Sequence, residues 1–288
     1  MAQVKDALII AAGLGTRMFP ASAMMPKEAL PLVDVPLMTH LVAEAKAAGV
    51  ERLHLVTSPT KSFEGLLRDT TDLHRLKPHL DANLFNITNG LEVLVHVQPE
   101  PKGVGDAMRC ALEDISGPVL VLLGDNLIMD RHATPDSFEA SGASSDLVRA
   151  FERTGEATVG LVAVPESDVQ RYGIVALEGS RMVGLVEKPS LEEAPSTLAL
   201  CGRYVFPSSL KSLLDRFSYE EHGDLQSIAV QQHWMEQGQL HGHVFSNVQW
   251  YDSGAPFMWL QAQIDHALRR EDHQDALRSW LQRRLDQR

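Results

Sequence analysis

The sequence Asp6-Ala-Leu-Ile-Ile-Ala-Ala-Gly-Leu-Gly-Thr-Arg17 joins a continuous apolar run to a glycine-rich turn that ends in a basic residue. A run without polar alternation is typical of a strand that is buried on both faces of a parallel sheet. The two glycines would let backbone N–H groups approach an anion closely. Two named phosphate motifs do not fit, because Met18 stands where a dinucleotide fingerprint has its third glycine, and a P-loop has four residues between its glycines. The turn therefore either binds phosphate or only connects a strand to a helix.

Strand-like and helix-like segments alternate through the first half of the chain. We expect strands at 52–57, 92–98 and 118–125 and helices at 37–48 and 103–115. Such alternation predicts βαβ units and an α/β fold with a doubly wound, mostly parallel sheet flanked by helices. Ligands of these sheets bind beyond the carboxyl ends of the strands. Gly13, Gln98 and Asp125 stand at or just past such ends, so we expect them on one rim of the sheet.

The second half is richer in short strands broken by proline and glycine. We expect strands at 158–164, 173–177, 182–187, 202–206 and 241–250, and helices at 210–217, 225–236 and 256–288. No internal repeat, low-complexity tract or obvious linker interrupts the chain. A single domain over residues 1–288, with a mixed region in its second part, is the simplest organisation.

The composition limits the classes of function. The 288 residues include 26 Lys plus Arg and 38 Asp plus Glu, and the formal net charge of −12 argues against a nucleic-acid partner. A few local cations can still bind a phosphate inside an acidic protein. Only two cysteines, Cys110 and Cys201, fit a reducing compartment. The apolar run Ala7–Ala12 is too short for a signal peptide or a membrane span, so we expect a cytoplasmic protein without a membrane partner.

A set of motifs follows the glycine-rich turn in a fixed order. Ala12-Gly-Leu-Gly-Thr-Arg17 precedes Pro26-Lys-Glu-Ala-Leu-Pro-Leu-Val-Asp34-Val-Pro36-Leu. Further along stand Gln98 with Lys102-Gly103, Leu123-Gly-Asp125, Tyr172-Gly-Ile-Val, Val186-Glu-Lys-Pro189, Gly202-Arg-Tyr-Val205 and Tyr251-Asp-Ser-Gly254. Over nearly the whole chain these motifs resemble the signature of the sugar-1-phosphate nucleotidylyltransferases. Within that family the first two are most similar to the bacterial uridylyltransferases that act on glucose 1-phosphate.

This resemblance implies a fold and a reaction. The expected fold is the Rossmann-like fold of nucleotide-diphospho-sugar transferases, divided into a nucleotide-binding half (1–130), a sugar-binding half (131–255) and C-terminal helices (256–288). The implied reaction transfers a uridylyl group from UTP to glucose 1-phosphate and releases pyrophosphate, with Mg²⁺ as cofactor. Because the sugar-phosphate oxygen attacks the α-phosphorus directly, the protein has mainly to neutralise charge and hold the line of attack. A homo-oligomer, dimer or tetramer, is also implied.

The resemblance assigns the nucleotide site to the first half. The residues expected around the nucleotide are Ala12, Gly13, Gly15 and Thr16. Arg17 and Lys27 would grip the triphosphate. Glu28 and Gln98 with Gly103 would read the base, since a uracil edge offers two acceptors and one N–H donor. Without the resemblance, Lys27 and Glu28 could form a solvated surface pair.

Two aspartates and a Glu-Lys pair complete the expected site. Magnesium prefers oxygen ligands and keeps waters and phosphates in its shell, so the two carboxylates that the resemblance assigns, Asp125 and Asp252, suffice. Taken alone, each could simply cap a turn. The resemblance also assigns the sugar hydroxyls to Glu187 and the sugar phosphate to Lys188, which alone would be an exposed strand end. The places where the sugar would lie close to the backbone are Gly173 and Gly202.

Some positions depart from the uridylyltransferase pattern. Leu-Gly-Asp125-Asn is closer to the thymidylyltransferases, whereas Glu28 favours uridine, because those relatives commonly have Gln at its position. A thymidylyltransferase or a uridylyltransferase for another sugar 1-phosphate is therefore an alternative. A non-catalytic regulatory protein that binds a nucleotide sugar is a further one. The chain disfavours it, because it retains all the expected catalytic residues, which are Arg17, Lys27, Lys188 and Asp125.

Overall fold

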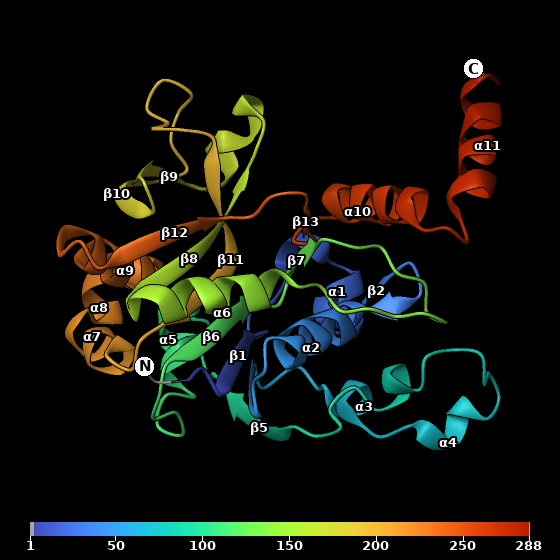
Figure 1. The fold of residues 1–288 in the computed structure, drawn as a ribbon, viewed down its shortest axis with the longest axis horizontal. Coiled ribbons are helices and arrows are strands. Elements are labelled where there is room, and N and C mark those ends of the chain that lie inside the picture. Colours follow the sequence, from blue (N-terminus) through green and yellow to red (C-terminus); the bar gives the residue numbers. More distant parts are fainter. Residues whose placement is uncertain (1–2, 288) are drawn as a thin grey trace.

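One nine-stranded mixed sheet forms the centre of the molecule (Figure 1). The computed structural model describes residues 3–287, so residues 1, 2 and 288 of the predicted domain lie outside the described residues. In sheet order the strands are β5 (Glu92–Val97), β4 (Arg52–Thr57), β1 (Asp6–Ile10), β6 (Val119–Leu123), β11 (Leu198–Phe206), β8 (Ala157–Ala163), β12 (Leu240–Val244), β10 (Arg181–Glu187) and β9 (Gly173–Glu178). The α/β fold that the sequence predicts is confirmed.

The sheet strands of the first half all run parallel. β1 lies between β4 and β6, and Ile10 at its end pairs with Val56 on one side and Leu123 on the other. β5 continues the parallel set beyond β4. In the second half β11 is antiparallel to β6 and β8, β12 is parallel to β8, and β10 and β9 form an antiparallel pair. The carboxyl ends of β1, β4, β5 and β6 therefore meet at one edge of the sheet.

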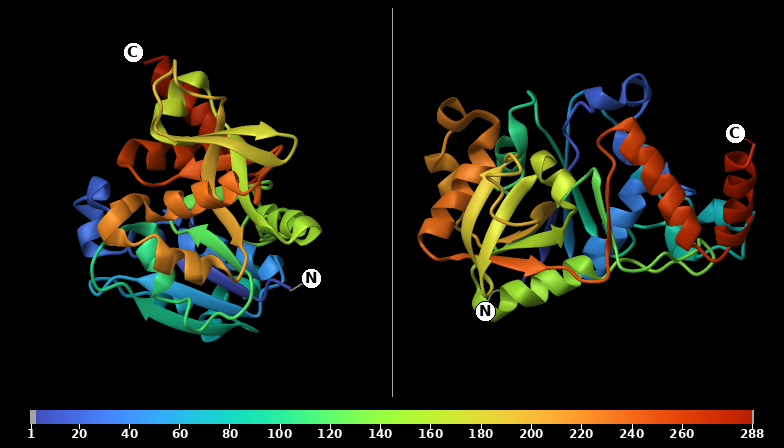
Figure 2. Two further views of the ribbon diagram at one scale, coloured as in Figure 1. Left: turned by 90° about the vertical axis from the view of Figure 1, so that its left-hand side faces the viewer. Right: turned by 90° about the horizontal axis from the view of Figure 1, so that it is seen from above.

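Alternating side chains of the sheet face two apolar layers. Ile9 and Leu122 belong to one buried cluster, and their neighbours Leu8 and Val121 belong to the other. Successive side chains of a strand point to opposite faces, so a strand that is apolar throughout can fill both layers. The first layer is covered by α2 (Leu37–Ala47) and α6 (Ala143–Thr154), and the second by α5 (Gly103–Arg109), α7 (Leu210–Arg216) and α9 (Gln226–Glu236) (Figures 1 and 2).

The segment 241–250, which we expected to be one strand, forms parts of two. β12 ends at Val244, and the chain turns at Asn247, whose φ of 57° is left-handed, before β13 (Gln249–Asp252) begins. The sequence prediction was wrong here because the Ser246-Asn247 turn signal is only two residues long within a strand-like run. β13 leaves the main sheet and pairs antiparallel with β7 (Asn126–Met129), which places Asp252 opposite Asn126.

Other boundaries also differ from the prediction. The helix expected at 103–115 ends at Arg109, and the amphipathic helix α6 had not been expected. The segment 256–288, where one or two amphipathic helices were expected, forms two, α10 (Pro256–Arg269) and α11 (Gln274–Leu285). Short elements complete the chain. They are α1 (Ala21–Met24), β2 (Pro31–Leu32), β3 (Val35–Pro36), α3 (Glu64–Leu67), α4 (Thr71–His74) and α8 (Tyr219–His222).

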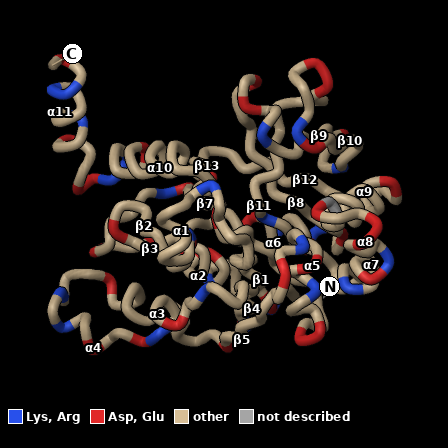
Figure 3. Tube along the Cα trace, turned by 180° about the vertical axis from the view of Figure 1, so that it is seen from behind, with Lys and Arg blue, Asp and Glu red and all other residues tan. Residues whose placement is uncertain are grey.

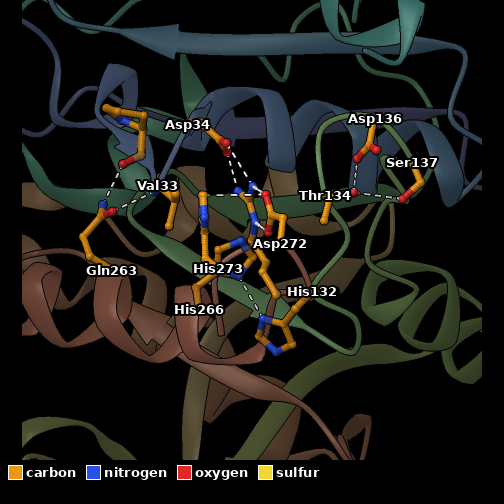
Figure 4. Close-up of polar contacts among 12 residues, drawn as sticks. Val33, Asp34, His132, Thr134, Asp136, Ser137, Gln263, His266, Asp272 and His273 are labelled. Carbon is orange, nitrogen blue, oxygen red and sulfur yellow. Dashed lines mark hydrogen bonds and ion pairs between the residues drawn. The ribbon is translucent and has the colours of Figure 1, made fainter. Parts of the chain in front are cut away.

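Helix α10 is fastened to the first half of the chain by polar contacts (Figure 4). The side-chain amide of Gln263 accepts a hydrogen bond from the Val33 backbone N–H at 2.7 Å and donates one to the Pro31 carbonyl at 2.6 Å. The Nδ1 atoms of His266 and His132 lie 2.8 Å apart. The two contacts of Gln263 hold helix α10 against the short hairpin of residues 31–36, which follows the glycine-rich turn.

Beyond α10 the chain turns at Arg270, whose buried guanidinium is enclosed by the carboxylates of Asp34 and Asp272. Helix α11 extends past this point and contacts α10 (Figure 2). Acidic and basic positions are interspersed along the chain, α11 included (Figure 3). Within residues 3–287, no helix combines the length and the apolar character that crossing a membrane requires.

A buried ion pair connects helix α2 to strand β11 of the sheet. Glu44 of α2 and Arg203 of β11 are almost completely inaccessible, with exposed fractions of 1% and 0%. The guanidinium of Arg203 donates to both carboxylate oxygens, with Nε–Oε1 at 2.9 Å and Nη2–Oε2 at 2.8 Å. It also donates to the carbonyls of Gly202 at 3.1 Å and Asn126 at 2.8 Å. Ser144 of α6 donates to Glu44 at 2.6 Å, so four elements share one charged centre.

We expect Glu44→Gln to destabilise the fold strongly, because it leaves the charge of Arg203 buried without a counter-charge. Breaking a buried pair in this way costs about 3–5 kcal/mol. Urea unfolding, with the slope of the transition held constant, measures the loss. The matched control is Glu51→Gln, which breaks the exposed 2.9 Å pair with Lys5 and should change the free energy of unfolding by less than about 1 kcal/mol. Equal effects of the two substitutions would contradict the role of the buried pair.

Candidate active site

A cleft of about 450 Å³ opens beside the carboxyl edge of the parallel strands, between β6, β11, β9, β10 and α9. It gathers residues that are far apart in the sequence. Seven of the residues predicted for the site line it, and they are Arg17, Asp125, Gly173, Glu187, Lys188, Gly202 and Asp252. Arg17 and the two predicted metal aspartates therefore meet the predicted sugar residues at one place. The residues predicted for nucleotide binding do not line this cleft, and they are Ala12, Gly13, Gly15, Thr16, Glu28, Gln98 and Gly103.

The two predicted metal aspartates are neighbours because β7 and β13 pair. Asp125 directly precedes β7 and Asp252 ends β13. Ser253 fixes the backbone of Asp125 by donating to its carbonyl from both the backbone N–H, at 2.8 Å, and the hydroxyl, at 2.7 Å. Asn126 orients the Asp125 side chain through a 2.9 Å hydrogen bond to Oδ1 and is itself held by the indole N–H of Trp250 at 2.7 Å.

The two carboxylates differ in their charge environment. Asp125 forms an ion pair with Lys27. Burial raises the pKa of Asp125, but the charge and hydrogen bond of Lys27 outweigh it, so the pKa lies below its ordinary value. Burial, reinforced by the charge of Asp125, raises the pKa of Asp252. Among the described residues Asp252 forms no ion pair, so its carboxylate oxygens are less occupied than those of Asp125.

Arg17 reaches the same place from the glycine-rich turn. A Cβ added at Gly254, two residues after Asp252, would lie 2.6 Å from Nη2 of Arg17 and 2.9 Å from Oδ1 of Asp252. The absence of a side chain at 254 therefore makes room for the guanidinium, and the Gly254 N–H donates to the same carboxylate oxygen at 2.9 Å. Arg17 supplies positive charge close to the two aspartates.

The sugar residues of the prediction lie on the opposite wall. Gly173 of β9 pairs with Glu187 of β10, and a Cβ at 173 would lie 2.9 Å from the Glu187 carboxylate. The carboxylate of Glu187 is one-third exposed and turns into the cleft. Lys188 has a left-handed φ of 48°, and its backbone N–H donates to the Tyr172 carbonyl at 3.0 Å. Non-glycine residues in this conformation are concentrated at functional sites, where the surrounding structure holds them.

The glycine-rich turn connects β1 to a short 3₁₀ turn at Thr16–Met18. Ala12 is buried, whereas Gly13 and Thr16 are exposed. The hydroxyl of Ser22 donates to the Gly15 carbonyl at 2.7 Å and so closes the loop from its far side. Because the glycine-rich turn directly follows β1, it lies at the edge of the sheet where the parallel strands end.

Glu28 does not form the surface pair that its neighbour Lys27 suggested. Its exposed fraction is 1%, and both of its carboxylate oxygens accept from Lys61, at 3.1 and 3.0 Å. Lys61 also donates to the Ala11 carbonyl at 2.9 Å. Burial raises the pKa of Glu28 and lowers the pKa of Lys61, against the attraction between them. This pair ties the Lys27 segment to the end of β1.

Gln98 follows β5 and is buried, and its side-chain N–H groups are both used. They donate to the Gly103 carbonyl at 3.1 Å and to the Asp106 carboxylate at 2.8 Å. Gly103 begins helix α5, so these contacts join two of the predicted base-reading residues into one unit.

The nucleotidyl transferase family profile matches residues 6–267 of this sequence. The chain belongs to the nucleotidyl transferase family. The match spans both walls of the cleft, from the start of β1 into helix α10.

Known relatives of this nucleotidyl transferase have similar length and architecture. The chain is 32% identical to the UTP–glucose-1-phosphate uridylyltransferase of Staphylococcus epidermidis, covering 98% of both proteins. It is similar to the UTP-bound UDP-glucose pyrophosphorylase structure from Acinetobacter baumannii, with 30% identity, a TM-score of 0.80, and coverage of 97% and 99% of the two chains. A UDP-glucose pyrophosphorylase complexed with UDP-glucose gives 26% identity, a TM-score of 0.78, and coverage of 92% and 98%.

Several site residues of this transferase were not predicted from the sequence. Asn126 and Trp250 orient the first aspartate, and Asn126 could have been suspected because it directly follows Asp125. Lys61 stands in an irregular loop after β4, where nothing in the sequence indicates that it pairs with Glu28. Asp106 lies within a predicted helix and carried no signal beyond a charge in its first turn.

We expect Gly254→Ala to lower the rate of nucleotidyl transfer about ten- to a hundred-fold, because the new methyl group must displace the Arg17 guanidinium and a misplaced catalytic group costs about this much. Pyrophosphate release measures the rate. Gly117→Ala is the control, since a Cβ at 117 meets nothing within 4 Å and should leave the rate unchanged. A Gly254→Ala variant with full activity would show that the rate does not depend on the position of the Arg17 guanidinium.

Proposed function

We propose that the protein transfers a uridylyl group from UTP to glucose 1-phosphate, forming UDP-glucose and pyrophosphate. The observation that carries this proposal is the single cleft in which Arg17, Asp125 and Asp252 face Gly173, Glu187 and Lys188. The relatives that are named for this reaction, or that bind UTP or UDP-glucose, share the fold over almost the whole chain and so support it.

In the proposed reaction an oxygen of the sugar phosphate forms a bond to the α-phosphorus of UTP. The bond from this phosphorus to the bridging oxygen breaks, and pyrophosphate leaves with the electron pair. Both reactants are anions, so the protein's contribution is charge neutralisation and alignment. Lys188 would hold the sugar phosphate, and Arg17 and Lys27 would hold the triphosphate and the departing pyrophosphate. The nucleotide itself would lie against the turn formed by Ala12, Gly13, Gly15 and Thr16.

The cleft would recognise the sugar, and residues beside the glycine-rich turn would recognise the base. Glu187 would accept hydrogen bonds from sugar hydroxyls, with Gly173 and Gly202 leaving space for the ring. Gln98, Gly103 and Glu28 would surround the base. Since both oxygens of Glu28 already accept from Lys61, we propose that Glu28 acts by holding Lys61 and the end of β1 in place.

The residues present fit a magnesium ion. Asp125 and Asp252 offer oxygen donors at adjacent strand ends, which are the ligands that magnesium prefers. A bound ion would supply positive charge against the phosphates of UTP. The carboxylates of Asp34 and Asp272 lie close to His273, but they already enclose Arg270, so the cleft is the better candidate for the cofactor. The cytoplasmic location and the homo-oligomer stay predictions.

The direct test is a pyrophosphate-release assay of the purified protein over UTP, dTTP, CTP and GTP with several sugar 1-phosphates. We expect the highest kcat/KM for UTP with glucose 1-phosphate, and a requirement for added Mg²⁺. Asp125→Asn should lower turnover about a hundred-fold or more, because it removes the charge that faces the cation. The control Asp136→Asn, at an exposed position outside the cleft, should not change it. Preference for dTTP would establish the thymidylyltransferase alternative, which the Gly124-Asp125-Asn126 turn suggested. Preference for another sugar 1-phosphate would establish the second alternative.

A second test concerns Glu28. Glu28→Gln should lower kcat/KM for UTP and dTTP by the same factor and also lower Tm, because it leaves Lys61 buried without its counter-charge. Parallel kinetics and melting curves measure both effects. Glu100→Gln, in an exposed 3.0 Å pair with Lys102, is the matched control. A loss confined to UTP, with unchanged Tm, would instead show that Glu28 reads the base.

A further inference from the structure

The amide of Gln98 has a fixed orientation. Its Nε2 lies between two groups that can only accept hydrogen bonds, the Gly103 carbonyl at 3.1 Å and the Asp106 carboxylate at 2.8 Å. The atom between two acceptors has to be the nitrogen, and its two N–H groups satisfy both. Among the residues that the structure describes, none donates a hydrogen bond to Oε1 of Gln98. The side chain therefore presents a free acceptor on the side away from Asp106.

Of the two side chains predicted to read the base, Gln98 is the one that keeps a free acceptor. The other candidate, Glu28, has both carboxylate oxygens on Lys61. The backbone N–H of Gln98 donates to the Thr57 carbonyl at 2.8 Å, which anchors the residue to the end of β4, beside β1 and its glycine-rich turn. The position of the free oxygen is thus fixed by both the backbone and the side chain.

We propose that Asp106 is a positioning residue that fixes the Gln98 amide with its oxygen toward the base, and that this arrangement selects uracil or thymine over cytosine. The inference rests on the proposed function, in which Gln98 contacts the base. Uracil and thymine carry a hydrogen on N3, which would donate to Oε1. Cytosine has a lone pair on N3, so two acceptors would face each other.

Asp106 raises the cost of adapting to the wrong base. To donate to cytosine N3, the Gln98 amide would have to rotate by half a turn. Rotation would break both hydrogen bonds of Nε2 and place Oε1 against the Asp106 carboxylate and the Gly103 carbonyl. Unpaired polar groups inside a site are a strong source of discrimination. Without Asp106 the amide would keep one partner and could turn more easily.

The test compares kcat/KM for UTP, dTTP and CTP in the wild type and in Asp106→Ala. We expect the UTP-to-CTP ratio to fall about ten-fold in the variant, the size of one hydrogen bond to a charged group. The UTP-to-dTTP ratio should stay constant, because both bases carry the N3 hydrogen. Glu113→Ala, which removes an exposed carboxylate paired with Lys211, should leave both ratios unchanged.

A double-mutant cycle separates positioning from a structural role. In a Gln98→Leu background, Asp106→Ala should not change the UTP-to-CTP ratio further. A fall in kcat/KM that is equal for all three nucleotides, or an equal change of the ratio in both backgrounds, would overturn the proposal. Calorimetric Kd values for UTP and CTP give the same ratio without turnover. A wild type that binds both equally refutes this inference, whereas one that binds UTP selectively but releases no pyrophosphate refutes only the proposed function.

Discussion

A guanidinium enclosed in the protein interior connects the two walls of the cleft. Arg203 is fully buried, and such a charge is tolerated only with a counter-charge and satisfied hydrogen bonds, which Glu44 and two backbone carbonyls provide. One carbonyl belongs to Gly202, on the wall predicted to bind the sugar, and the other belongs to Asn126, next to Asp125. The backbones of Gly202 and Asn126, which both line the cleft, are therefore joined through a single side chain that does not itself line it.

The charge balance of the cleft depends on the second pair of strands. Pairing of β13 with β7 brings Asp252 to Asp125, so two carboxylates with one paired lysine lie at the end of the sheet. The protein as a whole is acidic, with a net charge of −12, yet Arg17 and Lys188 both line the cleft. Arg17 and Lys188 come from opposite walls of the cleft. Local placement, and not net charge, makes such a protein suitable for anionic substrates.

The sequence predicted the parts of the structure that depend on local pattern. The apolar runs at Asp6–Ile10 and Val119–Leu123 are strands, and the ordered motifs led to seven residues that share one cleft. It missed what depends on distant pairing. The break between β12 and β13 rests on a two-residue turn, and the partner of Glu28 is a lysine in an irregular loop. The Glu44–Arg203 pair joins positions 159 residues apart, which no periodicity in a single sequence can reveal.

The claim that the two walls meet at Asp125 and Asp252 is tested most directly by locating a cation. A crystal of the protein with UDP-glucose and Mn²⁺, used as a substitute for Mg²⁺, would show the ion by its anomalous scattering. We expect a single strong peak in contact with the carboxylates of Asp125 and Asp252, with the sugar beside Gly173 and Glu187. A peak among Asp34, Asp272 and His273, with none between the two cleft aspartates, would contradict it.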